Sequence, residues 1–118
     1  MSRIATTWTG TWRNATWANG TIVKIQAAII AYFFVRRKAW GISVAPAQRV
    51  QVNPTRFRIP DVCVLLGEPE EQIFRRPPFL CVEILSPEDR MKRVQGRIDD
   101  YLAMGVKYVW VIDPSDRH

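Results

Sequence analysis

Residues 78–87 read PFLCVEILSP, an apolar run interrupted by one acid, Glu83, and closed by Ser86-Pro87. In an extended strand, alternation places Phe79, Cys81, Glu83 and Leu85 on one face, and Leu80, Val82 and Ile84 on the other. A carboxylate in such a run costs on the order of several kcal/mol to desolvate unless a cation or a hydrogen-bond donor meets it. The stretch therefore predicts a buried strand whose acid needs a partner.

The residues after this strand predict a helix and then a second strand. Ser86 suits the N-cap, Pro87 the first helical position, and the acids that follow suit the positive end of the helix dipole. Apolar residues at helical spacing continue to about Met104, and Gly105 is a suitable stop. Residues 106–112 are nearly all β-favouring, and Asp113-Pro114 closes the run. A helical crossover between two strands implies that the strands lie parallel.

A second acid stands at the start of another apolar run, RIPDVCVLL at residues 58–66. Pro60 favours extended geometry at Ile59, so a strand can begin at Asp61. Asp61 then shares a face with Cys63 and Leu65, and both acids can point the same way. Two carboxylates on neighbouring strands suggest a divalent metal site. In the alternative interpretation, Asp61 belongs to a turn and Glu83 pairs with an arginine.

The first half of the chain contributes a helix and a broken strand. An apolar stripe predicts a helix over residues 24–38, with Arg36, Arg37 and Lys38 at its negative end. Strand segments are expected near residues 42–44 and 49–52, separated by Pro46. The uncharged stretch at residues 25–35 is too short to span a bilayer, which needs about 20 residues. With 118 residues, the chain is expected to form one domain.

Charge and cysteine usage narrow the classes of function. Residues 1–60 contain nine basic residues and no acid, whereas residues 61–118 contain all 11 acids and eight basic residues. Such a split is typical of a nucleic-acid-binding arm, although the composition of residues 1–23 has a different explanation, given below. Cys63 and Cys81 lack the spacing of a zinc site, so reduced thiols in the core and a cytoplasmic location are expected.

Several of these stretches together resemble the Uma-type restriction endonucleases of the PD-(D/E)xK nuclease superfamily. The resemblance covers residues 24–118 and is carried by residues 58–62, 77–87, 99–102, 105–106 and 108–114. It implies an α/β, restriction-endonuclease-like fold with a central mixed sheet flanked by helices. Proteins of this kind continue past the Asp-Pro motif, so the domain is expected to be partial and truncated at its C-terminus. The strand ending at Ile112 is then expected to expose an edge or to pair with another protomer, as in a homodimer.

The resemblance also implies a chemistry. Asp61 and Glu83 would hold Mg²⁺, or Mn²⁺, during hydrolysis of a DNA phosphodiester. The superfamily's usual lysine, two residues after the glutamate, is replaced here by Leu85. Similar proteins supply it from the following helix, where Arg97 stands in this chain.

That substitution bears on catalysis, because arginine stays protonated and is a poor general base. Lys92 on the same helix is a possible substitute. Arg97 can also be a solvated residue on the flank of the helix, paired with Asp100 one turn later. A further departure lies at Ala47, where the family often has an acid.

Residues 1–23 have an atypical composition rich in Thr, Trp and Gly. Synonymous codons can be chosen for this segment so that a shifted frame gives EPDCDYVDGDVEERNVGERDHS. That string is similar to the acidic N-terminal segment of the same family. We therefore interpret residues 1–23 as an out-of-frame, poorly ordered segment that precedes a partial domain at residues 24–118.

Two functions of different class follow from the sequence. One is a Mg²⁺-dependent DNA endonuclease in which Asp61 and Glu83 bind the metal and Arg97 acts on the transition state. The other is a degenerate relative that keeps the fold without the chemistry, and that binds DNA or oligomerises.

Overall fold

The computed structural model of the chain describes residues 4–9, 19–69, 72–86 and 91–114. They form a mixed five-stranded sheet with strand order β1-β7-β6-β5-β2, and a separate hairpin, β3-β4. The elements are β1 (Ile4–Thr9), α1 (Asn19–Phe34), α2 (Arg37–Trp40), β2 (Ile42–Pro46), β3 (Val50–Asn53), β4 (Arg56–Arg58), β5 (Val62–Leu66), β6 (Leu80–Ile84), α3 (Met91–Met104) and β7 (Tyr108–Asp113).

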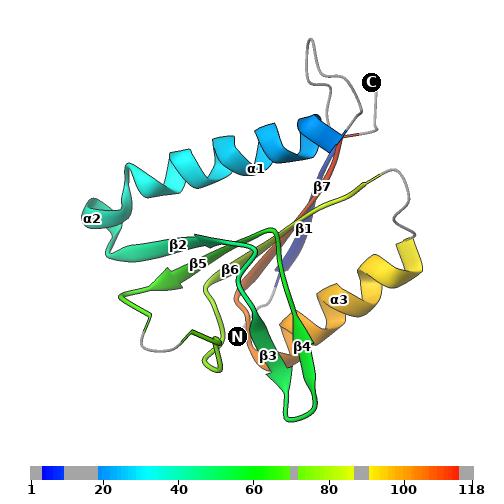
Figure 1. The fold of residues 1–118 in the computed structure, drawn as a ribbon. Coiled ribbons are helices and arrows are strands. Elements are labelled where there is room, and N and C mark those ends of the chain that lie inside the picture. Colours follow the sequence, from blue (N-terminus) through cyan, green and yellow to red (C-terminus); the bar gives the residue numbers. More distant parts are fainter. Residues whose placement is uncertain (1–3, 10–18, 70–71, 87–90, 115–118) are drawn as a thin grey trace.

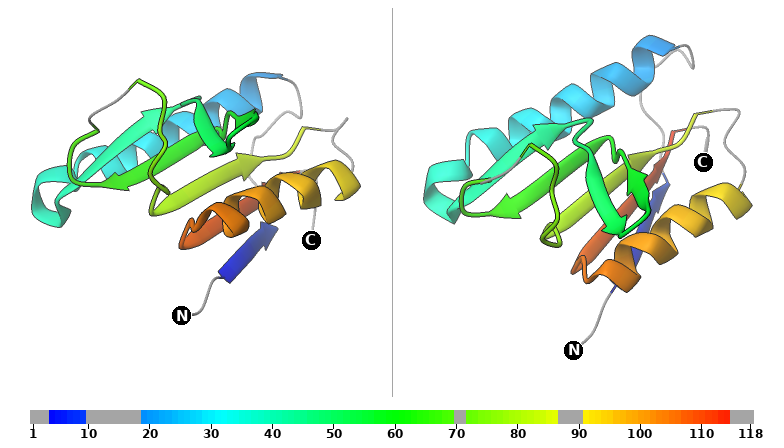
Figure 2. Two further views of the ribbon diagram at one scale, coloured as in Figure 1. Left: turned by 90° about the horizontal axis from the view of Figure 1, so that it is seen from below. Right: turned by 60° about the horizontal axis from the view of Figure 1, so that its bottom comes forward.

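The two long helices cover opposite faces of the sheet (Figures 1 and 2). On one face, Ile25 and Phe33 of α1 pack against the even-numbered residues of β5 and β6. On the other, Val94, Ile98 and Tyr101 of α3 share a cluster with odd-numbered residues such as Cys63 and Cys81. The sheet therefore has a buried layer on each side.

The alternation predicted for the two acid-bearing strands is largely confirmed. Val62, Val64, Leu80, Val82 and Ile84 belong to the α1-side cluster, whereas Cys63, Leu65, Cys81 and Leu85 belong to the α3-side cluster. The prediction was wrong for Phe79, which packs with the α1-side cluster. Phe79 precedes the first residue of β6, so the alternation of the strand does not apply to it.

The strand–helix–strand unit is also confirmed. β6 and β7 pair in parallel, with Leu80 opposite Tyr108 and Ile84 opposite Ile112. Gly105 ends α3 with a positive φ of 112°, a conformation that favours glycine. A Cβ at this position would also lie 3.2 Å from the Pro77 ring. The predicted start of α3 falls at residues 87–90, outside the described residues.

Two expectations need correction. The predicted helix at residues 24–38 is a longer α1 followed by the short helix α2. Strand β7 is not an edge strand, because β1 pairs with it in parallel from Ile4–Tyr108 to Thr9–Asp113. The edges of the sheet are β1 and β2. Whether residues 1–23 are poorly ordered in solution stays a prediction.

The β3-β4 hairpin lies beside α3 (Figure 1), and ion pairs join the two elements. The side chains of Arg56 and Arg58 approach the Asp100 carboxylate to 3.2 and 2.8 Å. Val50 and Val52 of β3 extend the α3-side core. Among the described helices, none combines the length and the apolar character that crossing a bilayer requires.

Candidate active site

Glu83 is a buried polar residue within β6, and its side chain is only 2% exposed. Both of its carboxylate oxygens accept hydrogen bonds from α3. The guanidinium of Arg97 donates to Oε1 at 2.9 Å, and the hydroxyl of Tyr101 donates to Oε2 at 2.5 Å. These two donors are the partners that the sequence requires for a carboxylate in an apolar strand.

The donors only partly offset the cost of burial. Burial raises the pKa of Glu83, and the nearby charge of Asp61 raises it further. Hydrogen bonds from Tyr101 and Arg97 and the charge of Arg97 act in the opposite direction. The resulting pKa is about 7, compared with an ordinary value of 4.5. At neutral pH, Glu83 is thus near the midpoint of its titration.

Asp61 lies just before β5 and forms hydrogen bonds with the residues on either side of Glu83. Its backbone amide donates to the carbonyl of Val82 at 2.9 Å, and its Oδ2 accepts from the amide of Ile84 at 2.7 Å. The Asp61 carbonyl also accepts from the Gln26 side chain on α1, at 2.8 Å. Asp61 is therefore held by the strand that carries Glu83 and by a helix on the opposite face.

The two predicted acids come together at one end of the β5-β6 pair. Asp61 bonds to the residues immediately before and after Glu83, and its charge contributes to the raised pKa of Glu83. Their joint role as metal ligands stays a prediction. The alternative proposed for Glu83 also describes a real contact, because Glu83 does pair with an arginine.

Arg97 is part of this site. The expectation that it pairs with Asp100 was wrong, because the described ion-pair partners of Asp100 are Arg56 and Arg58. Arg97 instead lies against Glu83, with 22% of its side chain exposed. Its position on α3 directs it to the sheet, whereas Asp100 lies beside the hairpin. The side chain of Lys92 lies outside what the structure describes, so its proposed role stays a prediction.

Ala47 also lies beside Asp61, as the resemblance implies for the family's extra acid. Its amide donates to the Asp61 carbonyl at 3.1 Å. Its φ is +46°, which is uncommon for a residue with a side chain. The backbone of Ala47 thus lies against the backbone of Asp61.

The two cysteines lie on the α3 side of the sheet, and each is two residues from one of the acids along the chain. Cys63 and Cys81 are register partners across β5 and β6, and both are free and buried. Their sulfur atoms are 3.9 Å apart. The hydrogen bond with Cys63, together with burial, raises the pKa of the Cys81 thiol. The predicted buried thiols are confirmed.

Tyr101 was missed as a site residue by the sequence, which suggested only an apolar helix position. The signal that could have found it is spacing, because Tyr101 follows Arg97 by one helical turn and so faces the same side. Burial and the adjacent charge of Glu83 raise the pKa of Tyr101 well above its usual range. The hydroxyl is therefore a permanent donor to Glu83.

Replacing Tyr101 by phenylalanine is expected to lower the free energy of unfolding at pH 8 by about 1.5–3 kcal/mol, because a hydrogen bond to a buried charged group is lost. The loss should be smaller at pH 5, where Glu83 is mostly protonated. Urea denaturation at the two pH values measures both effects. Tyr32→Phe, on an exposed ring, is the matched control, and equal losses at both pH values would contradict the prediction.

The residues fit a divalent cation that prefers oxygen ligands. Mg²⁺ sites commonly use one or two carboxylates and complete the shell with water and phosphate oxygens. Asp61 and Glu83 provide that donor set, and their mutual repulsion favours a cation between them. In the part of the chain that the structure describes, no group of three or more His, Cys, Asp or Glu residues could hold a metal.

Comparisons with known proteins identify the family and the fold of the chain. The profile of the Uma2 family, described as "Putative restriction endonuclease", matches residues 13–118. The match begins within the segment interpreted as out of frame, and that interpretation stays a prediction. No curated protein matched the chain.

A crystal structure titled as that of a putative nuclease belonging to DUF820, from Anabaena variabilis, superposes with a TM-score of 0.72. The two sequences are 24% identical, and the superposition covers 82% of this chain and 59% of the other. The expected restriction-endonuclease-like α/β fold is confirmed by this likeness. The chain thus spans less than two thirds of the length of that nuclease.

Proposed function

The chain belongs to the Uma2 family of restriction endonucleases, and from that premise we propose that it cleaves DNA phosphodiesters with the help of Mg²⁺ or Mn²⁺. The observation that supports this most directly is the contact of Asp61 with both neighbours of a buried Glu83. Two carboxylates brought together at a strand end are costly to the fold unless a cation is bound there. The cost is characteristic of a site kept for function.

In this proposal, Asp61 and Glu83 are the metal ligands and Arg97 is the cationic side chain beside them. Tyr101 donates to Glu83 Oε2 and Arg97 donates to Oε1, and each oxygen keeps a second lone pair for a ligand. Gln26 and the Ala47 amide fix the Asp61 backbone. A bound Mg²⁺ would supply a Lewis acid and an activated water.

Arg97 gives the site a positive charge that is suited to a phosphate. Its guanidinium lies 2.9 Å from Glu83 Oε1 and is partly exposed. Arginine binds phosphate oxygens well, but it does not accept a proton at neutral pH. We therefore infer that Arg97 stabilises phosphate charge and that the site lacks a protein base at this position. The two free thiols support a cytoplasmic location, and a homodimer remains part of the proposal.

Nicking of supercoiled plasmid tests this function. The wild-type chain is expected to nick DNA with Mg²⁺ or Mn²⁺ and to lose this activity with a chelator. Asp61→Ala and Glu83→Gln should each lower the rate at least tenfold, because each removes a metal ligand, and second-shell changes alone already cost about tenfold or more. Agarose gels of the relaxed product give the rates. Glu68→Gln, on an exposed loop, is the control that removes one carboxylate elsewhere.

Metal binding can be followed without cleavage. A ligand that binds only the folded state raises stability by RT ln(1 + [L]/Kd). Mg²⁺ should therefore raise the melting temperature of the wild type and leave that of Glu83→Gln unchanged. Equal and negligible nicking by all variants, without a thermal shift, would instead support the degenerate relative that keeps only the fold.

A further inference from the structure

An aromatic pocket of about 400 Å³ lies on the α1 side of the sheet, away from the acids. Its walls come from the end of α1, from α2 and from the starts of β6 and β7. Leu80 at the start of β6 lines it, whereas Glu83 lies near the other end of that strand and faces α3. The pocket and the candidate active site thus occupy opposite faces of the sheet.

The exposed aromatic rings of this pocket are unusual for a surface. Tyr32 is 49% exposed and Trp40 is 51% exposed, and they stand edge-to-face with ring centroids 6.2 Å apart. Phe33 forms a buried floor, and its ring centroid lies 5.9 Å from that of Trp110. The volume falls in the range of pockets that bind small organic ligands, about 300–1,000 Å³. Flat rings of this kind are the platforms on which nucleobases stack.

Cations flank the rings on two sides. The Arg36 guanidinium lies over the Tyr32 ring, 3.8 Å from its centroid. Across the pocket, the Lys107 ammonium is 5.7 Å from the Tyr108 ring centroid. No acidic residue lines this pocket, and within the described ranges neither cation has an acidic partner in an ion pair. The chemistry therefore suits a ligand that is both planar and anionic.

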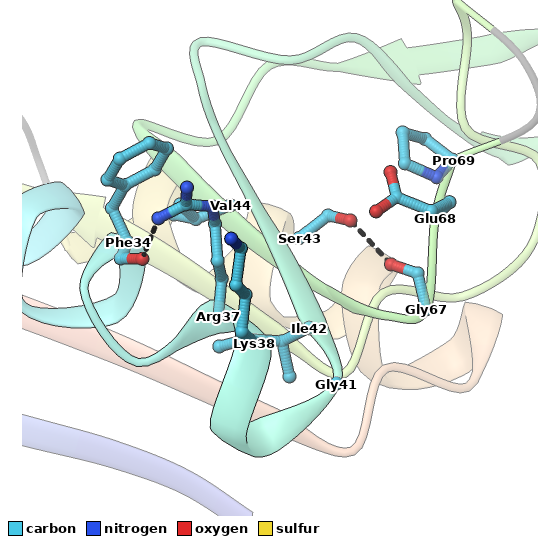
Figure 3. Close-up of a pocket in the computed structure, with 10 residues that line it drawn as sticks. All are labelled: Phe34, Arg37, Lys38, Gly41, Ile42, Ser43, Val44, Gly67, Glu68 and Pro69. Carbon is cyan, nitrogen blue, oxygen red and sulfur yellow. Dashed lines mark hydrogen bonds between the residues drawn. The ribbon is translucent and has the colours of Figure 1, made fainter.

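A second pocket, of about 520 Å³, lies on the other side of α2, and two basic residues line it. Arg37 and Lys38 of α2 line it, and Glu68 lies on the opposite wall (Figure 3). The Arg37 guanidinium lies over the Phe34 ring, 3.7 Å from its centroid. Helix α2 thus presents Trp40 to the aromatic pocket and two cations to its neighbour.

We propose that the aromatic pocket, together with α2, binds single-stranded DNA, with a base stacked on Trp40 and phosphates beside Arg36, Lys107 and the α2 cations. Aromatic platforms and basic grooves are the two parts of sequence-tolerant single-strand binding. Duplex DNA keeps its bases stacked inside and cannot use the pocket in this way. The choice of DNA as ligand rests on the proposed function, but the binding itself needs neither acid nor metal.

Fluorescence anisotropy with a labelled oligothymidylate of about 15 nucleotides tests the proposal, since single-strand sites span roughly 4–16 nucleotides. The full chain is used with a chelator, so that no metal contributes. Trp40→Ala is expected to weaken binding about tenfold, the scale of one lost base-stacking contact. Lys107→Ala should weaken it less and reduce its salt dependence. Phe57→Ala, on the exposed β4 strand, is the matched control and should bind as the wild type does.

The remaining outcomes separate the possibilities. Equal binding by wild type and Trp40→Ala, or equal affinity for duplex of the same length, would overturn the proposal. Association of the chain with itself through this face, detected by light scattering and lost in Trp40→Ala without any oligonucleotide binding, would also overturn it. Circular dichroism shows whether Trp40→Ala folds, and Trp40→Phe, which keeps a ring, should recover most of the affinity. Binding is measured with a chelator and needs no cleavage, so a failure of cleavage alone leaves this inference intact.

Discussion

Replacing Arg97 by lysine is expected to raise the rate of metal-dependent plasmid nicking by about 10²-fold, the lower end of what a positioned acid or base contributes. The guanidinium lies 2.9 Å from Glu83 Oε1, at the site itself. A lysine on the same turn of α3 can reach this position, and unlike arginine it can lose its proton when it is partly buried. The change thus restores a group that can exchange protons beside the acids.

The matched control for this variant is Arg93→Lys, on an exposed position of the same helix. It makes the same chemical change away from Glu83 and should leave the rate unchanged. Nicking by Arg97→Lys no faster than by Arg93→Lys would show that the arginine is not what limits the site. Lys92 would then be the next residue to test.

Ala47 provides an independent test of whether a third carboxylate at the site strengthens metal binding. Its amide contacts the Asp61 carbonyl, so we expect a carboxylate introduced at this position to reach the two acids. The positive φ of Ala47 carries a cost for any residue with a side chain, and the substitution keeps that cost unchanged. Ala47→Glu in the Arg97→Lys background should therefore tighten Mg²⁺ binding, measured by thermal shift.

The local parts of the fold could be predicted because each rests on neighbouring residues. Alternation assigned Cys63 and Cys81 to one face, and Gly105 ended α3 as expected. The pairing of β1 with β7 could not be predicted, because it joins residues about 100 positions apart and depends on backbone hydrogen bonds rather than on a side-chain pattern. The break between α1 and α2 at residues 35–36 could not be predicted either, because no proline or glycine in the sequence marks it.

In the candidate site, too, some residues could be predicted from the sequence and others could not. Asp61 and Glu83 could be predicted because an acid in an apolar strand stands out against its neighbours. The partner of Arg97 could not be predicted, because the sequence offers it two acids, Glu83 on β6 and Asp100 on α3 itself. The hairpin decides between them by supplying Arg56 and Arg58 to Asp100. Tyr101 was hidden because its ring belongs to the core and only its hydroxyl belongs to the site.

Glu83 is expected to make the stability of the fold fall as pH rises. Its pKa is about 7 in the folded chain and near 4.5 when it is exposed, so the folded state binds more protons between these values. The stabilising contribution is complete below about pH 4.5 and is lost as pH rises through about 7. A difference of about 2.5 units corresponds to about 3 kcal/mol, at 1.36 kcal/mol per unit.

Glu83→Gln should remove this pH dependence, because the amide keeps the shape of the side chain and does not ionise. Urea denaturation between pH 4 and 9 gives the difference in unfolding free energy between the two proteins, and this difference should change by about 3 kcal/mol across the range. Glu68→Gln, on an exposed loop, tests whether loss of any one carboxylate has the same effect. A flat difference curve for Glu83→Gln would mean that Arg97 and Tyr101 fully offset the burial of the carboxylate. In that case, Mg²⁺ added at pH 8 should change the unfolding free energy little. If the curve is instead steep, and Mg²⁺ flattens it in the wild type but not in Glu83→Gln, the destabilised carboxylate is the group that binds the metal.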